Sequence, residues 1–148
     1  MSTPATVLVL DTNVVLDWLV FRDPSSLPLA EALQSARAAW HACAVMRQEL
    51  EQVLTRVEFN RWQPDVPAVL ANWDRWARVA DAPPPAPDGL RCSDPDDQVF
   101  LDLAFAQQAT ALVTRDRALL RLARPAGRRG LQVLTPEAWA RSAVGERP

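Results

Sequence analysis

The chain has 148 residues, the size of one ordinary domain, and 49% of them are hydrophobic while 23% are charged. This balance excludes an intrinsically disordered chain, and we expect one domain over residues 1–148. A formal net charge of −2 excludes a uniformly basic surface of the kind that many DNA-binding domains carry. All 16 basic residues are arginines, which excludes reactions that need a lysine, such as Schiff-base formation and P-loop phosphate binding.

Cysteine and histidine are too scarce for several kinds of site. A structural zinc site usually needs four such ligands, and the chain has three: His41, Cys43 and Cys92. A Ser-His-Asp site would depend on His41 alone. Two cysteines with no evident pairing are typical of a reducing cytoplasm. The first eleven residues, MSTPATVLVLD, contain no basic stretch and only a short apolar run, so we expect neither a signal peptide nor a membrane anchor.

In the first half of the chain, short apolar runs alternate with helical patterns. Residues 5–10 (ATVLVL) are apolar and rich in β-branched side chains, which is typical of a strand buried on both faces. The elements expected in this half are a strand at residues 5–10, a helix at about 14–19, a helix at about 29–38, a strand at about 40–43 and a helix at about 44–58.

The second half continues in the same way after Pro64 and Pro67. An amphipathic helix carries Trp73 and Trp76, and residues 82–88 (APPPAPD) can only be a loop or polyproline II. The elements expected after this loop are a helix at about 95–108, a strand at 111–114, a helix at 116–123, an Arg/Gly turn at 124–130, a strand at 131–134 and a short final helix from 135.

Buried strands that alternate with helices predict a parallel sheet covered on both faces, which is a three-layer α/β/α domain. In such sheets the functional crevice lies beyond the carboxyl ends of the strands. Four acidic residues lie at or near the predicted junctions between strands and helices, and these are Asp11, Glu49, Asp97 and Asp116.

Each junction has a simpler explanation as well. Asp11 and Asp116 fit helix N-caps, where a carboxylate accepts hydrogen bonds from free N–H groups. Asp94 fits an N-cap with Pro95 at the first helical position, and Asp97 stands where a capping-box partner would.

Glu49 is harder to explain by capping or solvation. It has Val45 and Val53 at a spacing of four residues, so it borders the buried stripe of its helix without a basic neighbour at that spacing. Glu51, by contrast, has Arg47 there. If Glu49 and the three aspartates converge, their mutual repulsion calls for a cation. Oxygen ligands without histidine or thiol favour Mg²⁺ or Mn²⁺.

Four segments in the same order resemble the motifs of the PIN domain, in particular those of bacterial toxins from toxin–antitoxin systems. The resemblance runs from about residue 6 to 139, which we take as the domain core, and its motifs are VLDTNV (9–14), QEL (48–50), DPDD (94–97) and LVTRD (112–116). It implies a five-stranded parallel sheet and an endoribonuclease that uses Mg²⁺ or Mn²⁺. It also implies an antitoxin protein as partner.

By this resemblance the metal-binding and catalytic residues are Asp11, Glu49, Asp97 and Asp116. The resemblance also makes Asn13 and Thr114 supporting polar residues. Asp96 adjoins Asp97 and is the alternative ligand; we place the ligand at Asp97 because its spacing to residues 113–114 fits better.

Arginines are concentrated just after the fourth motif. Arg115, Arg117 and Arg121 are candidates for contacts to RNA phosphates, and a solvated helix face is the alternative. Trp73 and Trp76 lie three residues apart on one helix face, where core packing, a partner surface and base stacking are all open. Because these tryptophans offer an apolar surface, and because the resemblance suggests it, we expect a homodimer.

Two other functions compete with the nuclease. The first is a phosphatase of the haloacid-dehalogenase type or a phospho-receiver, with Asp11 as the nucleophile. That phosphatase requires a second aspartate two residues after the nucleophile, and this position is Asn13. Both classes normally use a lysine, and the chain has none. The second is a non-catalytic module with the PIN fold, against which the intact set of acids argues.

Overall fold

The computed structural model describes residues 6–145 and contains a five-stranded parallel sheet. The strand order is β3-β2-β1-β4-β5, and every neighbouring pair is parallel. The strands are β1 (Thr6–Leu10), β2 (Ala38–Cys43), β3 (Ala77–Ala80), β4 (Ala111–Val113) and β5 (Gln132–Leu134). The predicted three-layer α/β/α fold is confirmed.

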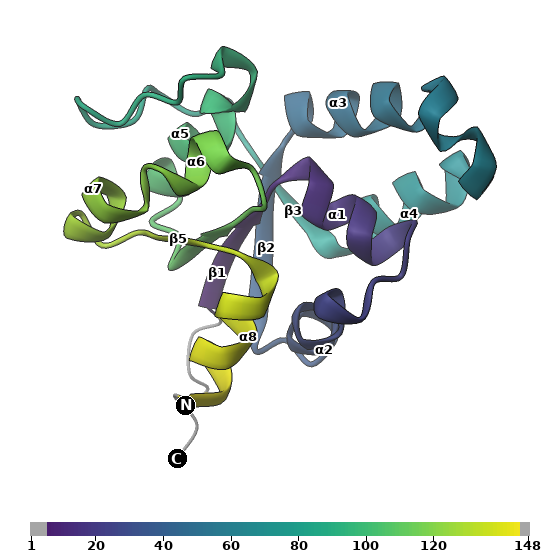
Figure 1. The fold of residues 1–148 in the computed structure, drawn as a ribbon, viewed down its shortest axis with the longest axis horizontal. Helices are drawn as coiled ribbons and strands as arrows, with labels where there is room; N and C mark the ends of the chain where they lie inside the picture. The colour runs from purple at the N-terminus through teal and green to yellow at the C-terminus, as the bar shows by residue number, and fades with distance from the viewer. Residues whose placement is uncertain (1–5, 146–148) are drawn as a thin grey trace.

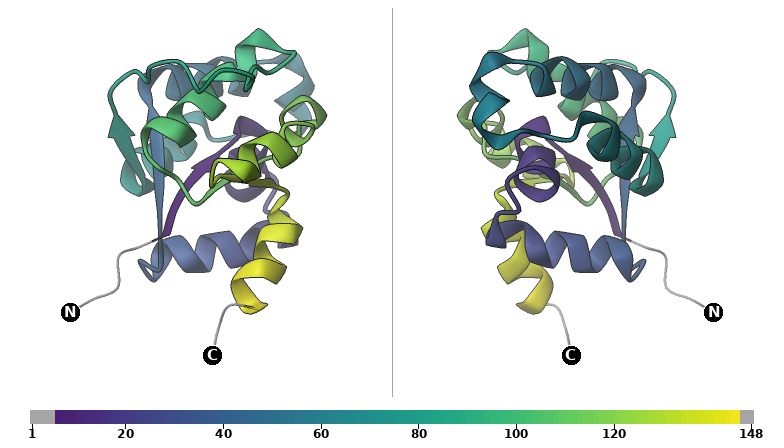
Figure 2. Two further views of the ribbon diagram at one scale, coloured as in Figure 1. Left: turned by 90° about the vertical axis from the view of Figure 1, so that its left-hand side faces the viewer. Right: turned by 90° about the vertical axis from the view of Figure 1, so that its right-hand side faces the viewer.

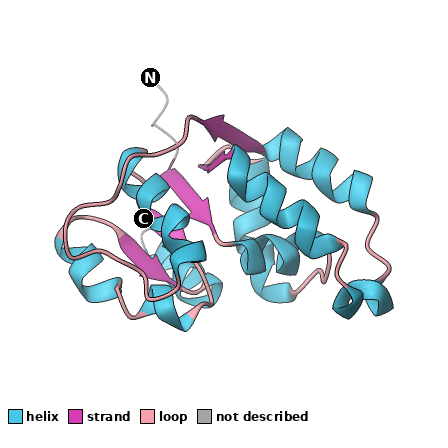
Figure 3. Ribbon diagram, turned by 90° about the horizontal axis from the view of Figure 1, so that it is seen from above, coloured by secondary structure: helices cyan, strands magenta, loops and turns pink. Residues whose placement is uncertain are grey.

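Helices cover both faces of this sheet. Figure 1 shows α1 to α4 on one side of the strands and α5 to α7 on the other, and Figure 2 shows each side from the front. Seen from above, the strands form a layer between the two groups of helices (Figure 3). Helices and 3₁₀ turns have these bounds: α1 (Thr12–Leu19), η1 (Pro24–Ser26), α2 (Leu27–Gln34), α3 (Ala44–Leu54), η2 (Val57–Trp62), α4 (Val66–Trp76), η3 (Pro95–Asp97), α5 (Gln98–Ala106), α6 (Arg117–Leu120), α7 (Ala123–Arg128) and α8 (Pro136–Gly145). Within residues 6–145, no helix is long and apolar enough to cross a membrane.

The central strand β1 shows how the sequence produces this sheet. Leu8 and Val9 are fully buried, as expected for an apolar run with helices above and below it. Leu8 is in register with Trp40 of β2 on one side and with Ala111 of β4 on the other. The carboxyl ends of β1 and β4 therefore lie side by side at one edge of the sheet.

Several element boundaries differ from the sequence predictions. The strand β3 was not predicted from its residues, because Arg78 and Val79 are exposed and the strand pairs with β2 alone at the edge of the sheet. The helix expected to reach residue 58 ends at Leu54, and η2 follows it. The expected Arg/Gly turn contains α7. Ala5 of the first predicted strand lies outside the described residues.

Trp40 is the largest fully buried side chain of the described core, and two other tryptophans pack against it. The ring centroids of Trp18 and Trp73 lie 5.9 and 5.7 Å from that of Trp40, both in edge-on arrangements. Trp73 is 2% exposed, so the expectation that it offers an apolar surface for dimerisation is wrong. Its amphipathic spacing reflects core packing, because α4 packs this side chain against the face of β2.

We predict that Trp40→Ala lowers the free energy of unfolding by about 3–5 kcal/mol, because the two neighbouring rings cannot close the cavity. Trp40→Phe should cost clearly less, since it keeps an aromatic contact and removes an indole N–H that has no hydrogen-bond partner among the described residues. Urea unfolding followed by fluorescence measures both. Equal losses for the two variants would contradict this packing.

Candidate active site at the carboxyl ends of β1 and β4

The sheet reverses its winding direction between β1 and β4. The chain that leaves β1 proceeds to β2 on one side, while the chain that leaves β4 proceeds to β5 on the other. In parallel sheets a crevice opens where the two connections diverge. Asp11 follows β1 directly, and its backbone N–H donates a 3.0 Å hydrogen bond to the carbonyl of Val113 in β4. Sequence-predicted site residues thus occupy both sides of this crevice.

Asp11 is 3% exposed and is held by Thr114. The Thr114 hydroxyl donates a 2.7 Å hydrogen bond to Oδ2 of Asp11. Burial raises the pKa of Asp11 to about 6, although the Thr114 hydrogen bond opposes this shift. Asp11 occupies the N-cap position of α1, but its side chain makes no capping hydrogen bond to that helix, so capping does not explain its carboxylate.

Thr114 also orients Asp116. The backbone N–H of Asp116 donates a 2.9 Å hydrogen bond to Oγ1 of Thr114. Oδ1 of Asp116 accepts a 2.9 Å hydrogen bond from the N–H of Ala118, so Asp116 does cap α6, as the alternative explanation predicted. One threonine therefore links an acid at the end of β1 to an acid beyond the end of β4.

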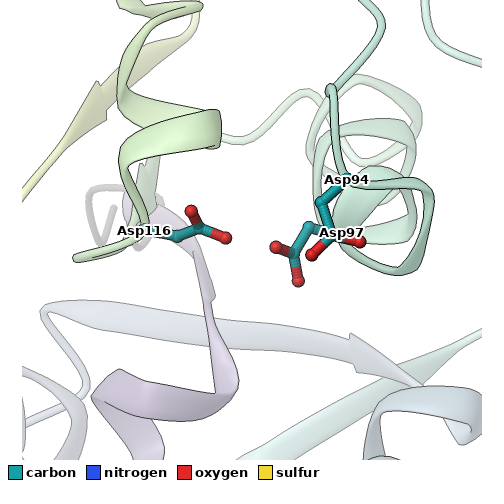
Figure 4. A group of neighbouring side chains, drawn as sticks. All are labelled: Asp94, Asp97 and Asp116. Carbon is teal, nitrogen blue, oxygen red and sulfur yellow. The ribbon is translucent and has the colours of Figure 1, made fainter.

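Three aspartates meet across this crevice. Oxygen atoms of Asp94, Asp97 and Asp116 all lie within 4.8 Å of one another. Figure 4 shows Asp116, at the start of α6, facing Asp94 and Asp97 from the opposite segment. The structure thus brings together two of the predicted ligands and adds Asp94, which was expected only to cap a helix.

Local geometry explains why Asp94 joins the cluster. The residues Pro95–Asp97 form the 3₁₀ turn η3, with Asp94 as its N-cap accepting a 3.0 Å hydrogen bond from the N–H of Asp96. A 3₁₀ helix has three residues per turn, so side chains three positions apart lie on the same face. The three-residue spacing of Asp94 and Asp97 in the sequence is the signal that could have predicted their proximity.

The pKa values of Asp97 and Asp116 are shifted in opposite directions. Burial, a hydrogen bond to Asp116 and the charges of Asp11, Asp116 and Asp94 raise the pKa of Asp97 to about 8. The same hydrogen bond, donated by Asp97, lowers the pKa of Asp116. A carboxyl group beside a carboxylate is the expected arrangement when like charges are crowded without a cation.

Glu49, Asp96 and Asn13 lie outside this group of three aspartates. Oε2 of Glu49 accepts a 2.8 Å hydrogen bond from Oγ1 of Thr12, and its charge raises the pKa of Asp11. Asp96 is exposed and lines a cleft together with Glu49. Asn13 is exposed, and its side chain makes no hydrogen bond within residues 6–145. The Thr12 contact was not foreseen, since no local pattern links residues 37 positions apart.

Arg115 has a structural role that the sequence did not suggest. Its guanidinium donates hydrogen bonds of 2.8 Å to Asp17, 2.9 Å to Glu137 and 2.7 Å to Ser25. These bonds join the loop after β4 to α1, η1 and α8. The predicted phosphate contact would have to compete with three existing partners, so Arg115 is better explained as a brace for this loop.

Arg117 and Arg121 are exposed at the two ends of α6, the short helix that Asp116 caps. The charge of Arg121 lowers the pKa of Asp116, which places this guanidinium near the acids. A positive side chain beside an acidic crevice suits the approach of a phosphate group.

The donor set fits a hard divalent cation. Carboxylate oxygens from three residues lie within 4.8 Å, and histidine and thiol ligands are absent from this group. Asp97, Asp116 and Asp94 would hold such an ion, which would supply the compensating positive charge. Asp11 is close enough to this group for its charge to raise the pKa of Asp97.

Comparison with known proteins gives one family match. Residues 7–118 match the model of the PIN domain, a segment that contains all the acids of the crevice and ends within α6. Among curated proteins, none matches the chain. The matched segment spans well over half of the 148 residues, so it establishes the family.

The raised pKa values predict how stability depends on pH without metal. Between pH 3.8 and about 8 the folded chain binds protons at Asp11 and Asp97 more tightly than the unfolded chain does. The contribution of these two groups to the free energy of unfolding is therefore greatest at low pH. It is lost as the pH rises through about 6 for Asp11 and about 8 for Asp97. Urea unfolding in EDTA across this range measures it.

Asp11→Asn should remove the loss of stability near pH 6. An amide has no proton to lose in this range, and its oxygen can still accept the Thr114 hydrogen bond. At pH 8 in EDTA the variant should be at least as stable as the parent. Asp88→Asn, a change of the same kind on the exposed loop at residues 82–88, is the matched control. A variant that is less stable at pH 8 and keeps the parental pH dependence would contradict the assigned environment of Asp11.

Proposed function

Because the chain belongs to the PIN-domain family, we propose that it is an endoribonuclease that depends on Mg²⁺ or Mn²⁺. The observation that supports this most strongly is the group Asp94, Asp97 and Asp116 at the switch point of the sheet. Proteins of this family are generally metal-dependent nucleases. The choice of RNA as substrate comes from the resemblance of the four motifs.

In this proposal Asp97, Asp116 and Asp94 hold the cation, and Asp11 is a fourth acid next to them. When bound, the cation would lower the pKa of a coordinated water and stabilise negative charge on the leaving oxygen of a phosphodiester. Thr114 fixes the orientation of Asp11 and of the segment that carries Asp116, which keeps both acids in place before substrate arrives. Glu49, fixed by Thr12, adds negative charge on the α3 side of the crevice.

The arginines of α6 are proposed to attract the RNA. Arg121 and Arg117 are exposed, and the charge of Arg121 acts on Asp116 in an acidic centre that would otherwise repel phosphate. Arg115 contributes indirectly, since it braces the loop from which Asp116 projects.

The phosphatase alternative is less well supported. A nucleophilic Asp11 would have to leave a buried position in which Thr114 occupies one of its oxygens. The chain also has no lysine to assist phosphoryl transfer. A purely structural module would have no need for three crowded carboxylates, whose repulsion is unfavourable without a ligand.

We predict that the purified chain cleaves single-stranded RNA only when Mn²⁺ or Mg²⁺ is present. Asp97→Asn and Asp116→Asn should each reduce the rate at least about 100-fold, on the order of 2.7 kcal/mol in activation free energy, because each removes a ligand of the cation. Glu31→Gln, an exposed change on α2, is the control and should retain the parental rate. Cleavage that persists in EDTA would contradict the proposal.

We further propose that the nuclease is the toxin of a toxin–antitoxin pair, with a small antitoxin protein as partner and a homodimer as the working form. Trp73 is buried, and Trp76 is partly buried against the core. The dimer therefore rests on the motif resemblance alone.

A toxin of this kind should arrest growth when the chain is expressed in bacteria from an inducible promoter. Asp97→Asn should relieve the arrest, because the substituted centre no longer cleaves RNA. The measurement is culture density after induction, with immunoblots to show equal amounts of protein. Arrest that persists unchanged in Asp97→Asn would contradict a nuclease toxin.

A further inference from the structure

A large cavity lies between the start of α3, the end of β3 and α5. Its volume is about 700 Å³, which is within the range of small-ligand sites. Val45, Val79 and Val99 give it an apolar lining. Val45 and Val79, two large hydrophobic side chains that are strongly exposed, both line this cavity.

This cavity continues into the cleft beside the acidic cluster. A neighbouring cleft of about 260 Å³ is lined by Glu49 and Asp96, and it shares Val45 and Val99 with the cavity. Both are lined by residues of α3 and α5. In Figure 1, α3 and the segment before α5 are at the top of the molecule. Because Asp96 adjoins Asp97, a chain whose phosphate lay at the acidic cluster could place a neighbouring group in the cavity.

One carboxylate of the cavity is fixed in place. Oδ1 of Asp102 accepts hydrogen bonds from the N–H of Ala86 at 2.8 Å and from Nε2 of Gln98 at 2.9 Å. Gln98 is itself held, since its amide accepts from the N–H of Cys92 at 2.6 Å and donates to the carbonyl of Leu90 at 3.0 Å. Oδ2 of Asp102 has no hydrogen-bond partner among the described residues. Asp102 therefore lines the cavity with a carboxylate that is held through Oδ1 and has acceptor capacity left on Oδ2.

The remaining polar groups of the lining complete a recognisable pattern. Asp81 adds a second carboxylate, which like Asp102 can only accept hydrogen bonds while ionised. Gln48, exposed on α3, can donate through its amide. A ligand that suits this lining is apolar over most of its surface, offers hydrogen-bond donors to the two carboxylates and offers an acceptor to the amide of Gln48.

We infer that this cavity binds an unpaired guanine base of the RNA, an inference that rests on the proposed nuclease function. The Watson–Crick edge of guanine carries N1–H and N2–H₂ as neighbouring donors, with O6 as an acceptor beside them. Adenine and cytosine place a ring acceptor next to their single amino group, and uracil flanks its N–H with two carbonyls. Each of these would bring an acceptor against the carboxylates. Apolar faces and edge hydrogen bonds are the usual means of reading unpaired bases.

Binding of nucleoside 5′-monophosphates tests the cavity without any cleavable bond. In the presence of Mg²⁺, guanosine 5′-monophosphate should bind at least about tenfold more tightly than the adenosine, cytidine and uridine forms, measured by NMR titration. Inosine 5′-monophosphate lacks the N2 amino group and should bind more weakly than the guanosine form. Equal affinities for all five would overturn the inference, whether the cavity is then empty or serves a protein partner.

Two variants link the preference to the named residues. Asp102→Asn can keep its Oδ1 hydrogen bonds while Nδ2 replaces the free acceptor, so it should lose the guanine preference and melt within a few degrees of the parent. Gln48→Ala should weaken guanosine binding without affecting folding. Gln34→Ala, at the exposed end of α2, is the control. A guanine preference that survives Asp102→Asn would also overturn the inference.

The outcomes separate this inference from the nuclease proposal. Guanine-selective nucleotide binding without RNA cleavage would support the cavity and refute the nuclease. RNA cleavage without any preference for guanine next to the cut, together with equal nucleotide affinities, would support the nuclease and refute the cavity.

Discussion

A hydrogen bond between Thr114 and Asp11 connects the ends of the two strands on which the site is built. Because Thr114 also accepts from the N–H of Asp116, one hydroxyl fixes acids from both sides of the crevice. β1 and β4 are adjacent and parallel, and the segments that follow them leave in opposite directions. The position of the crevice therefore follows from the strand order, and its chemistry follows from the residues that come directly after each strand.

Crowding of like charges is the cost of this arrangement. Asp97 lies against Asp116 and near Asp11, and burial together with these charges raises its pKa to about 8, so that retention of a proton would relieve the repulsion. The neighbouring structure is correspondingly well fixed: Arg115 braces the loop after β4 with three hydrogen bonds. The fold holds these acids close together although they repel one another. This arrangement lowers the stability of the metal-free protein and is suited to binding a cation.

Elements with strong local patterns could be predicted from the sequence, and those defined by tertiary contacts could not. The β-branched run that ends at Leu10 identified the central strand, and the acids after the strands identified the crevice. The edge strand with Arg78 and Val79 was missed because it has one neighbour and no buried alternation. The contact of Thr12 with Glu49 depends on how α1 packs against α3, which no spacing within either helix reveals.

The central claim is that Asp94 and Asp97, in the segment before α5, and Asp116, just after β4, form a cation site. Anomalous scattering from crystals soaked in Mn²⁺ tests it most directly. The account predicts a manganese peak in contact with carboxylate oxygens of Asp97 and Asp116, and no such peak in crystals of Asp97→Asn. A well-occupied peak at another place in the molecule, or none at millimolar Mn²⁺ while the crystals still diffract, would contradict it.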